Sequence, residues 1–502
     1  MAKIDPLNLS LEAQVAQMVM VRASGYSLDH QRQYPQWELS NGELLQLIKD
    51  GIGGVILVGG TVGEVGKRTA ELQRHGRIPL FIAADVEEGV GQGFAGGTRL
   101  PPPMALFAIW QKRPALAVAL AREMGRIIAK EALAIGINWL FAPVADVNSN
   151  PHNPVINVRS FGENPQAVIE LSSAFLEGAK EVPVLTCAKH FPGHGDTKID
   201  SHLDTPIIEK DRSQFYEIEL PPFQRLIEAG VDGVMTAHLI ARAWDEERIT
   251  TFSPVLVKGL LQEEMGFSGL VITDALVMGG VGNLSAAEIA VQAIQAGVDI
   301  LLMPPDPWAT IEAIVSAVEQ KLIPRERVIH SCQKILLAKE KLSSYASDFG
   351  CLGNPEHQQV SQQIADLSIS YHLPCAPVAI ENCLSLWISD RPHPSDAHTN
   401  QNLSAISVAP PLLCHLNLDN LPPVFLQVTS RGQPFQGRSQ WAESISSFIT
   451  ALVQVDKLRL VLLYGSPYNL VLLKALLPDH IPWGFAYSEL GQSILLGKLT
   501  SR

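Results

Sequence analysis

The stretch Val184-Leu-Thr-Cys-Ala-Lys-His-Phe-Pro-Gly-His-Gly-Asp196 joins a short apolar run to a dense group of titratable side chains. Residues 184–188 form a nearly continuous apolar run, which is typical of a strand that is covered on both faces. From Lys189 onward, proline and glycine indicate a loop, which closes on Asp200-Ser-His202. Titratable groups at this density are costly to bury unless they bind or transfer something. The stretch therefore predicts a strand whose end opens into a functional site.

The same arrangement recurs along the chain up to residue 345. Eight apolar runs are separated, in most cases, by segments with helical composition or spacing. The runs cover residues 17–22, 54–59, 80–85, 138–143, 184–188, 233–238, 270–274 and 299–303. The clearest helical segments are residues 114–133 and residues 286–296. Eight strand–helix units predict a (β/α)8 barrel, and an open doubly wound sheet is the alternative.

Polar residues at the C-terminal ends of the runs favour the barrel over the open sheet. They are Asp85, Asp146, Lys189, His190, His238 and Asp274. In a barrel these ends meet at one mouth, whereas in an open sheet they are spread along an edge. We therefore predict an α/β fold in which a TIM-like (β/α)8 barrel is followed by a smaller α/β sandwich domain.

A chain of 502 residues is long enough for two domains. We expect the barrel domain over residues 1–345, a linker over 346–360 and the sandwich-like domain over 361–502. In the second domain, strand-like runs cover residues 384–389, 424–428 and 458–463, and helical segments cover residues 441–453 and 469–476. Residues 391–405 are rich in proline, serine, histidine and asparagine and predict an exposed loop.

The composition is that of an ordinary globular protein, with 46% hydrophobic and 18% charged residues. The net charge of −13 and the lack of a basic cluster argue against a nucleic-acid partner. No apolar run approaches the length of a membrane span, and residues 1–10 lack the features of a signal peptide. Six cysteines without CxxC spacing indicate neither a zinc site nor a disulfide framework. We expect a cytoplasmic protein without a metal, another cofactor or a membrane partner, and the sequence gives no signal for its oligomeric state.

The histidines of the loop have an alternative interpretation as metal ligands. His190 and His194 are four residues apart, and His202 follows. This spacing favours metal binding on a helix, which Pro192 and Gly193 preclude here. A polar surface loop without a ligand is the other alternative.

Three residues outside the loop are further candidates for the site. Asp274 and Asp85 each end an apolar run, where a carboxylate is either buried for structural reasons or catalytic. Arg159 follows a loop rich in proline and asparagine, where an arginine forms either a surface ion pair or a ligand contact. The residues alone leave these alternatives open.

Several motifs, in the same order along the chain, resemble glycoside hydrolase family 3 and, within it, the bacterial exo-β-N-acetylglucosaminidases of peptidoglycan recycling. The motifs are Asp85-Val-Glu-Glu-Gly89, Ala142-Pro-Val-Ala-Asp-Val147, Arg159-Ser-Phe-Gly162, Lys189-His-Phe-Pro-Gly-His-Gly195, Asp200-Ser-His202, Met235-Thr-Ala-His238 and Thr273-Asp-Ala-Leu276. Lys-His-Phe-Pro-Gly-His-Gly together with Asp-Ser-His is specific to the N-acetylglucosaminidase branch. The resemblance spans the whole barrel domain and is weaker in the second domain.

The resemblance implies a retaining hydrolysis of terminal, non-reducing, β-linked N-acetylglucosamine from muropeptides or related saccharides. Asp274 would attack the anomeric carbon and form a covalent glycosyl-enzyme, and His202 would be the general acid/base in place of the usual second carboxylic acid. Asp200 would orient His202, since residues two apart in a loop can set a carboxylate beside an imidazole and fix its tautomer. The sugar hydroxyls would be bound by Asp85, Arg159, Lys189, His190 and His238.

The chain departs from the family pattern next to Asp85. Relatives usually read Asp-x-Glu-Gly-Gly-Arg here, whereas Glu88 replaces the first glycine in this chain and Val90 stands where the arginine is common. This departure puts in doubt a contact at the edge of the sugar site and leaves the catalytic residues unaffected.

The second domain can supply a glutamate as acid/base in β-glucosidase relatives. The glutamates available here are Glu381, Glu443 and Glu489. The intact Asp-Ser-His motif makes that role unnecessary, so we expect the second domain to be structural or to support binding.

Two alternative functions stay open. The first is a β-glucosidase or a phosphorolytic relative, because a neutral histidine at position 202 would repel an incoming phosphate less than a glutamate would. The second is a sugar-binding protein without catalysis. The combination of Asp274, Asp200 and His202 argues against it, because binding alone needs neither a nucleophile nor a proton shuttle.

Overall fold

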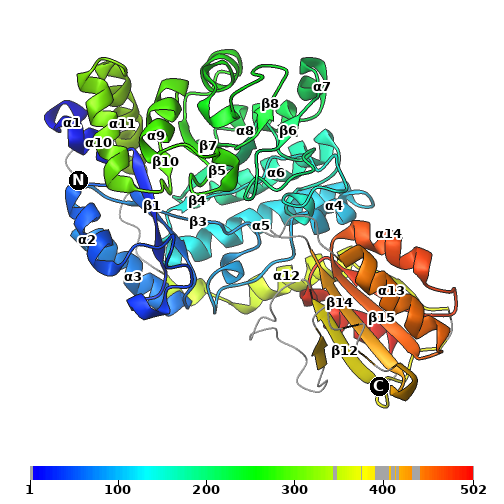
Figure 1. The fold of residues 1–502 in the computed structure, drawn as a ribbon. Coiled ribbons are helices and arrows are strands. Elements are labelled where there is room, and N and C mark those ends of the chain that lie inside the picture. The colour runs from blue at the N-terminus through cyan, green and yellow to red at the C-terminus, as the bar shows by residue number, and fades with distance from the viewer. Residues whose placement is uncertain are drawn as a thin grey trace.

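The computed structural model describes residues 4–342, 348–374, 376–389, 406–408, 413, 416, 418–431 and 441–500. The chain forms a β/α barrel and a smaller α/β domain that lies beside it (Figure 1). Helix α12 (Pro355–Ser368) leads from one to the other and begins inside the segment 346–360 that we expected to be a linker. The predicted loop at 391–405 lies outside the described residues.

Eight parallel strands make up the barrel. They are β1 (Val19–Ser24), β2 (Gly54–Val58), β3 (Phe81–Ala84), β4 (Trp139–Leu140), β5 (Leu185–Phe191), β7 (Gly233–Thr236), β9 (Leu270–Thr273) and β10 (Leu301–Leu302). Their order is β10-β1-β2-β3-β4-β5-β7-β9, and a parallel bridge between Ile272 and Ile300 joins the two ends. Each predicted run overlaps one of these strands and the bridge closes the sheet, so the barrel is confirmed and the open sheet is wrong.

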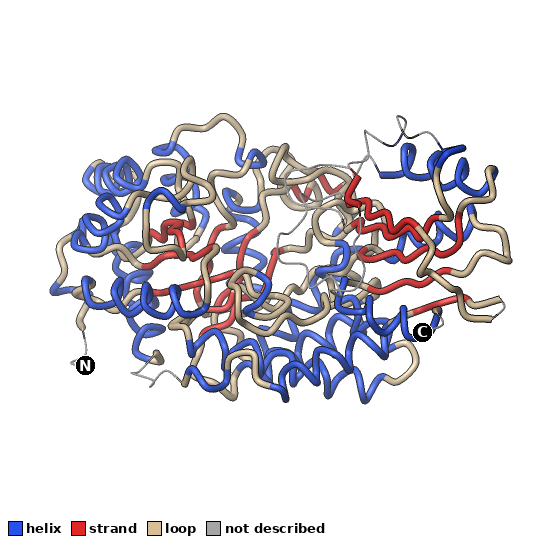
Figure 2. Tube along the Cα trace, turned by 90° about the horizontal axis from the view of Figure 1, so that it is seen from below, coloured by secondary structure: helices blue, strands red, loops and turns tan. Residues whose placement is uncertain are grey.

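Helices surround the strands (Figure 2). They are α2 (Asn41–Asp50), α3 (Val62–His75), α5 (Pro114–Ala134), α6 (Pro165–Ala179), α8 (Leu220–Glu228), a π-helix (Val255–Glu264), α9 (Ala286–Ala296), α10 (Pro307–Glu319) and α11 (Arg325–Glu340). Shorter elements are α1 (Leu11–Ala16), α4 (Met104–Trp110), α7 (Arg212–Glu217), β6 (Ile207–Ile208) and β8 (Ile240–Ala241). Helices α2, α3 and α9 each begin with a capping box, in which Ser or Thr pairs with a Glu three residues later. The two helices predicted most clearly from sequence are α5 and α9.

One difference in the strands bears on the site. We predicted that the strand ends at Ala188, but β5 continues to Phe191 and carries Lys189 and His190. Its pairing with β7 shifts register between Lys189 and Phe191. The titratable residues therefore begin on the rigid sheet and not in the loop, which holds them more firmly.

Aromatic side chains fill part of the barrel interior. The Trp139 ring lies 4.8 Å from the Phe81 ring and 5.5 Å from the Phe141 ring, both in edge-on arrangements. All three side chains are fully buried. A Cβ atom at Gly233 would lie 3.0 Å from the Trp139 ring, so a larger residue there would force the indole to shift.

The second domain is built on a six-stranded sheet with the order β11-β16-β15-β14-β12-β13. The strands are β11 (Ser370–His372), β12 (Leu384–Ser389), β13 (Ile406–Val408), β14 (Val424–Ser430), β15 (Leu458–Gly465) and β16 (Trp483–Ala486). Only β11 pairs antiparallel among these described strands. The helices are α13 (Trp441–Gln454), α14 (Pro467–Leu476) and α15 (Gln492–Leu499). The predicted strands and helices of this domain are all found.

Polar contacts join the two domains. Glu131 on α5 is fully buried and accepts hydrogen bonds from the Thr98 amide (2.7 Å), from His357 Nδ1 on α12 (2.7 Å) and from the Gly353 amide (3.0 Å). The hydroxyl of Tyr468, in the second domain, accepts a hydrogen bond from the Asn148 side chain at 2.7 Å. These contacts connect the barrel to α12 and to the second domain.

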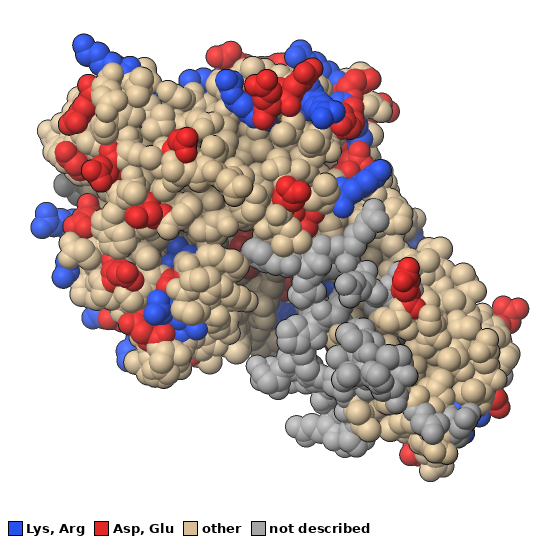
Figure 3. All heavy atoms as spheres, viewed as in Figure 1, with Lys and Arg blue, Asp and Glu red and all other residues tan. Residues whose placement is uncertain are grey.

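The surface drawn in Figure 3 carries acidic and basic side chains that are interspersed. This distribution differs from the basic face that nucleic-acid binding requires. Within the described part of the chain, no helix combines the length and the hydrophobicity that crossing a membrane requires.

Replacing Trp139 by alanine is expected to lower the free energy of unfolding by about 3–5 kcal/mol, because it empties a fully buried site between two aromatic rings. Urea unfolding measures the change. Trp308→Ala is the control, since Trp308 is 40% exposed. Its replacement is expected to lower the free energy of unfolding by less than about 1 kcal/mol, as for other surface changes. Equal losses in the two variants would contradict this account of the core.

Candidate active site

A cavity of about 460 Å³ opens at the carboxyl ends of the barrel strands. Six of the eight predicted site residues line it, namely Asp85, Arg159, Lys189, His190, His202 and Asp274. Asp200 and His238 lie behind this wall and contact residues that form it. The barrel thus brings together side chains that are almost 200 residues apart in the sequence.

On one wall, Lys189 lies between two carboxylates. Its Nζ atom is 2.7 Å from Asp85 Oδ1 and 2.6 Å from Glu87 Oε1. Glu87 also accepts two hydrogen bonds from Arg159, at 2.7 and 2.9 Å. Glu87 is 3% exposed, whereas the Asp85 side chain is 52% exposed. Glu87 therefore neutralises the two cations from behind, and Asp85 presents a carboxylate to the cavity.

These charges persist at neutral pH. Burial alone would raise the pKa of Glu87, but Arg159 and Lys189 hold that pKa well below its usual range. Burial alone would lower the pKa of Lys189, but Asp85 and Glu87 raise it to about 12. Glu87 was not among the predicted site residues, although it lies two residues after Asp85 in the motif Asp85-Val-Glu-Glu-Gly89.

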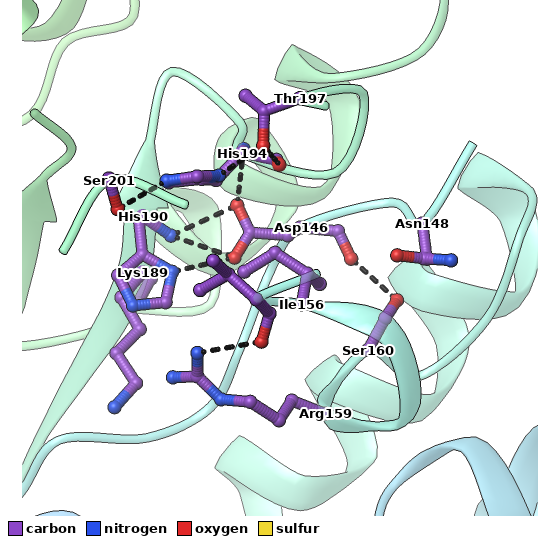
Figure 4. Close-up of polar contacts among 12 residues, drawn as sticks. Asp146, Asn148, Ile156, Arg159, Ser160, Lys189, His190, His194, Thr197 and Ser201 are labelled. Carbon is purple, nitrogen blue, oxygen red and sulfur yellow. Dashed lines mark hydrogen bonds and ion pairs between the residues drawn. The ribbon is translucent and has the colours of Figure 1, made fainter. Parts of the chain in front are cut away.

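Asp146 organises the turn from β5 into the following loop (Figure 4). Its carboxylate accepts hydrogen bonds from the His190 amide at 3.1 Å, from the His194 amide at 2.7 Å and from His190 Nδ1 at 2.7 Å. Burial alone would raise the pKa of Asp146, but His190 and the other contacts lower it. An ionised carboxylate only accepts, so Nδ1 of His190 carries a proton. Asp146 was expected at the barrel mouth but was not assigned a role.

His194 ties the loop to itself. Its Nδ1 atom is 2.9 Å from Thr197 Oγ1, and its Nε2 atom is 2.8 Å from Ser201 Oγ. The side chain of Asn153 donates to the His194 carbonyl at 2.8 Å. Burial, together with the neighbouring His190, lowers the pKa of His194 to about 4, so the ring is neutral at pH 7. His194 thereby holds Ser201, the residue before His202.

Asp200 holds the His202 ring. Asp200 Oδ1 lies 2.8 Å from His202 Nδ1 and accepts the His202 amide at 2.9 Å. The Asp200 side chain is fully buried and that of His202 is 16% exposed, facing the cavity with its other edge. The amides of Gly279 and Gly280 donate to the carbonyls of His202 and Ser201. A Cβ atom on either glycine would lie within 2.7 Å of this segment, so the close approach requires glycine.

Asp274 follows the last residue of β9 and lines the cavity. Its Oδ1 atom accepts the Ala275 amide at 2.7 Å. Burial alone would raise the pKa of Asp274, but the nearby His190, His238 and His202 outweigh it and lower the pKa to about 2. Asp274 is therefore an ionised carboxylate that faces an open cavity, which is the state that a nucleophile requires.

The position of His238 differs from the prediction that this residue contacts a sugar. Its side chain is fully buried outside the cavity wall. Nδ1 lies 2.9 Å from Thr251 Oγ1, and Nε2 lies 3.1 Å from the Ala275 carbonyl. Burial lowers the pKa of His238. These contacts place it behind Asp274, where it supports the segment that carries the carboxylate.

The contacts of the loop histidines bear on the alternative interpretation of the loop as a metal site. Within the described residues, no three His, Cys, Asp or Glu side chains are grouped so that they could hold a metal ion. Both ring nitrogens of His194 contact hydroxyl groups, and the Nδ1 atoms of His190 and His202 contact carboxylates. None of the glutamates Glu381, Glu443 and Glu489 lines the cavity.

The family of the protein follows from comparison with known sequences. Residues 10–338 match the Glycosyl hydrolase family 3 N terminal domain, and residues 396–500 match the Bacterial Glycosyl hydrolase family 3 C-terminal domain. The chain belongs to glycoside hydrolase family 3. The family resemblance that the motifs indicated is therefore confirmed.

Individual relatives are similar over much of the chain. Beta-hexosaminidase A of Pseudoalteromonas piscicida is 34% identical over 365 residues, which are 65% of this chain and 60% of that protein. Beta-hexosaminidase of Nitrosomonas eutropha is 35% identical over 283 residues, which are 55% of this chain and 81% of that protein. A solved glycoside hydrolase family 3 beta-N-acetylglucosaminidase from Paenibacillus sp. str. FPU-7 is 27% identical with a TM-score of 0.81, and the alignment covers 98% of this chain and 97% of that chain.

Glu87→Gln is expected to lower the free energy of unfolding by about 3–5 kcal/mol, because it leaves the buried cations of Lys189 and Arg159 without their shared carboxylate. Chemical denaturation measures the loss. The matched control is Glu177→Gln on α6, which is exposed and is expected to change stability by less than roughly 0.5 kcal/mol. A Glu87→Gln protein as stable as the control would show that the network is not needed for folding.

The stability contribution of Asp274 is expected to fall in acid. An aspartate in an unfolded chain titrates near pH 3.9, whereas the folded pKa of Asp274 is about 2. The ionised form is thus favoured by folding, and this stabilisation is present above pH 4 and is lost as the pH falls through 2. From pH 5 to pH 3, the unfolding free energy of the wild type is expected to fall by about 1 kcal/mol relative to that of Asp274→Asn. No fall of the wild type relative to the variant over this range would contradict the assigned ionisation.

Proposed function

We propose that the protein is a retaining exo-β-N-acetylglucosaminidase. It releases terminal, non-reducing, β-linked N-acetylglucosamine from muropeptides or related saccharides. The observation that carries this proposal is that an ionised Asp274 and the His202–Asp200 pair belong to one cavity, beside the network around Lys189. The names of the similar hexosaminidases and of the similar N-acetylglucosaminidase structure support the choice of sugar.

In the first step, Asp274 attacks the anomeric carbon of the bound sugar. The glycosidic bond breaks as His202 Nε2 donates its proton to the leaving oxygen, and an ester bond forms between Asp274 and the sugar. Asp200 holds the Nδ1 proton of His202 at 2.8 Å and so aims Nε2 at the cavity. The carboxylate also stabilises the imidazolium that must be present before the proton is donated.

In the second step, His202 is neutral and accepts a proton from an incoming water. The water oxygen attacks the anomeric carbon, the ester bond to Asp274 breaks, and the carboxylate is regenerated. Two displacements at the same carbon return the original β configuration. A histidine suits both steps, because it changes its protonation state close to neutral pH.

The sugar is bound, in this proposal, by the wall opposite the proton donor. Asp85 accepts hydrogen bonds from hydroxyl groups, while Lys189, Arg159 and His190 contact the sugar from the strand ends. The half-exposed carboxylate of Asp85, held at one oxygen by Lys189, supports this role. His238 acts through the Ala275 carbonyl, next to Asp274, and does not contact the sugar.

We place this activity in the cytoplasm. The four cysteines that the structure describes, Cys187, Cys332, Cys351 and Cys383, are free thiols. Unpaired thiols suit a reducing compartment. Activity in the cytosolic fraction of the native cell tests this part of the proposal, and activity confined to the medium would contradict it.

Asp274→Ala is expected to lower kcat on p-nitrophenyl N-acetyl-β-glucosaminide on the order of 10⁴-fold or more, because it removes the nucleophile. Asp204→Ala is the matched control, since Asp204 is an exposed acid just beyond His202. The wild type is expected to cleave the glucosaminide far faster than the matching glucoside, and phosphate is expected not to change the rate. Undiminished turnover by Asp274→Ala would refute the mechanism, whereas glycosyl phosphate as the main product would favour phosphorolysis.

His202→Ala is expected to separate substrates by their leaving groups. A saccharide leaving group needs a proton, so its cleavage is expected to slow by about 10²–10⁴-fold. p-Nitrophenolate leaves without one, so formation of the glycosyl-enzyme is expected to slow much less, which pre-steady-state kinetics measures. Equal losses on both substrates would contradict the assignment of His202 as the proton donor.

A further inference from the structure

Among the described residues of the second domain, Arg431 is the one that lines the cavity. Arg431 directly follows β14 and lines the cavity beside Asp85 and Glu87. Its Nη1 atom donates to Glu88 Oε2 at 2.7 Å, and its Nη2 atom pairs with the other oxygen of the same carboxylate. The side chains of Arg431 and Glu88 are 12% and 1% exposed. The wall of the cavity is therefore closed by a buried ion pair between two domains.

Stability alone does not explain such a pair. A buried ion pair gives little net stabilisation, because removing both charges from water costs about as much as their attraction returns. Apolar residues of similar size would join the domains at least as well. This pair also lies at the cavity and not deep in the interface, so a role in binding accounts for its position.

The loop after β3 has no arginine at position 90, although it carries Arg99 at the cavity wall. Val90 stands where family members commonly have one, and its side chain is fully buried in the hydrophobic core with Phe94 and Leu100. It does not line the cavity. Glu88, which replaces a glycine of the usual pattern, points instead to Arg431. Val90 thus removes a guanidinium that relatives commonly have in this loop, and Glu88 holds the guanidinium of Arg431, from the second domain, at the cavity wall.

We propose that Arg431 is a specificity-determining residue that the second domain contributes to the sugar pocket, with Glu88 as its positioning residue. The inference rests on the proposed function. The guanidinium has five N–H donors in a planar fork, so it can hold the Glu88 carboxylate and hydrogen-bond a sugar hydroxyl at the same time. The hydroxyl concerned belongs to the non-reducing sugar and lies on the side of Asp85, because Arg431 is held by Glu88, three residues after Asp85 in the same loop.

A second contact on the same wall supports this placement. Arg99 also lines the cavity, and its guanidinium lies 3.8 Å from Glu489 of the second domain. Glu489 in turn accepts a hydrogen bond at 3.3 Å from Thr429, which lies two residues before Arg431 on β14. The end of β14 is therefore held at the cavity from both sides. The charge of Arg431 also persists there, since burial lowers its pKa only to about 10.

Three variants test the inference. Arg431→Ala removes the proposed donor but leaves Glu88 buried without its cation. Glu88→Gly/Arg431→Ala removes both charges and so restores an uncharged wall. Arg459→Ala is the matched control, because Arg459 is a partly exposed arginine on β15 of the same domain, paired with Asp456 near the surface. The readouts are kcat and KM on p-nitrophenyl N-acetyl-β-glucosaminide, the Kd of N-acetylglucosamine by calorimetry, and Tm.

Arg431→Ala and the double variant are both expected to raise KM and Kd by about 10- to 100-fold, which is the usual loss for one hydrogen bond from a charged donor. The change in kcat is expected to be smaller. The double variant is expected to recover the Tm that Arg431→Ala loses, while its KM stays raised. Should Arg431→Ala fail to fold, Arg431→Lys replaces it, since it keeps the charge, loses the planar fork and is expected to raise KM at least several-fold.

The opposite results overturn the inference. KM and Kd within twofold of wild type in both Arg431→Ala and the double variant would exclude a sugar contact. A KM that returns to the wild-type value in the double variant, together with the Tm, would show a purely structural pair. Failure of the proposed function is seen separately, because it requires that the wild type itself neither binds N-acetylglucosamine nor cleaves the glucosaminide.

Discussion

The carboxylate of Asp146 accepts the amides of His190 and His194 and the Nδ1 atom of His190, and the geometry of the barrel mouth depends on these three bonds. They fix the point at which β5 ends and the loop begins. They also fix the ring of His190 and, through His194, the position of Ser201 and the residue after it. A buried carboxylate is costly to maintain without such partners. Here three hydrogen bonds offset the cost of burying the Asp146 carboxylate. Each of them also orders a part of the site.

The other buried carboxylates of the cavity also have charged partners. Glu87 balances Lys189 and Arg159, and Glu88 balances Arg431, so the charged wall consists of carboxylates and cations that are paired with one another and largely buried. An intact pair of this kind contributes little to net stability, although removing one partner is costly, and it holds donors and acceptors in fixed directions. The wall is therefore preorganised for a ligand that presents several hydroxyl groups. It also makes the second domain a part of the site and not only an appended unit.

The eight barrel strands could be predicted because strands that are buried on both faces are apolar throughout, and helices α5 and α9 because their spacing is regular. The end of β5 was placed too early, since Lys189 and His190 are polar residues within a strand. Asp146 and Glu87 were not assigned roles, because their partners are 44 to 102 residues away and local patterns do not encode such pairs. Arg431 belongs to no motif, and only the folded chain brings it to Glu88.

Mass spectrometry of the protein after reaction with a fluorinated N-acetylglucosaminide tests the central claim most directly. The fluorine slows breakdown of the glycosyl-enzyme, so the sugar accumulates on the nucleophile. The account predicts one sugar per chain, on the peptide that contains Asp274, and none on Asp274→Asn. A label on another residue, or turnover of the reagent with no covalent sugar on Asp274, would contradict it.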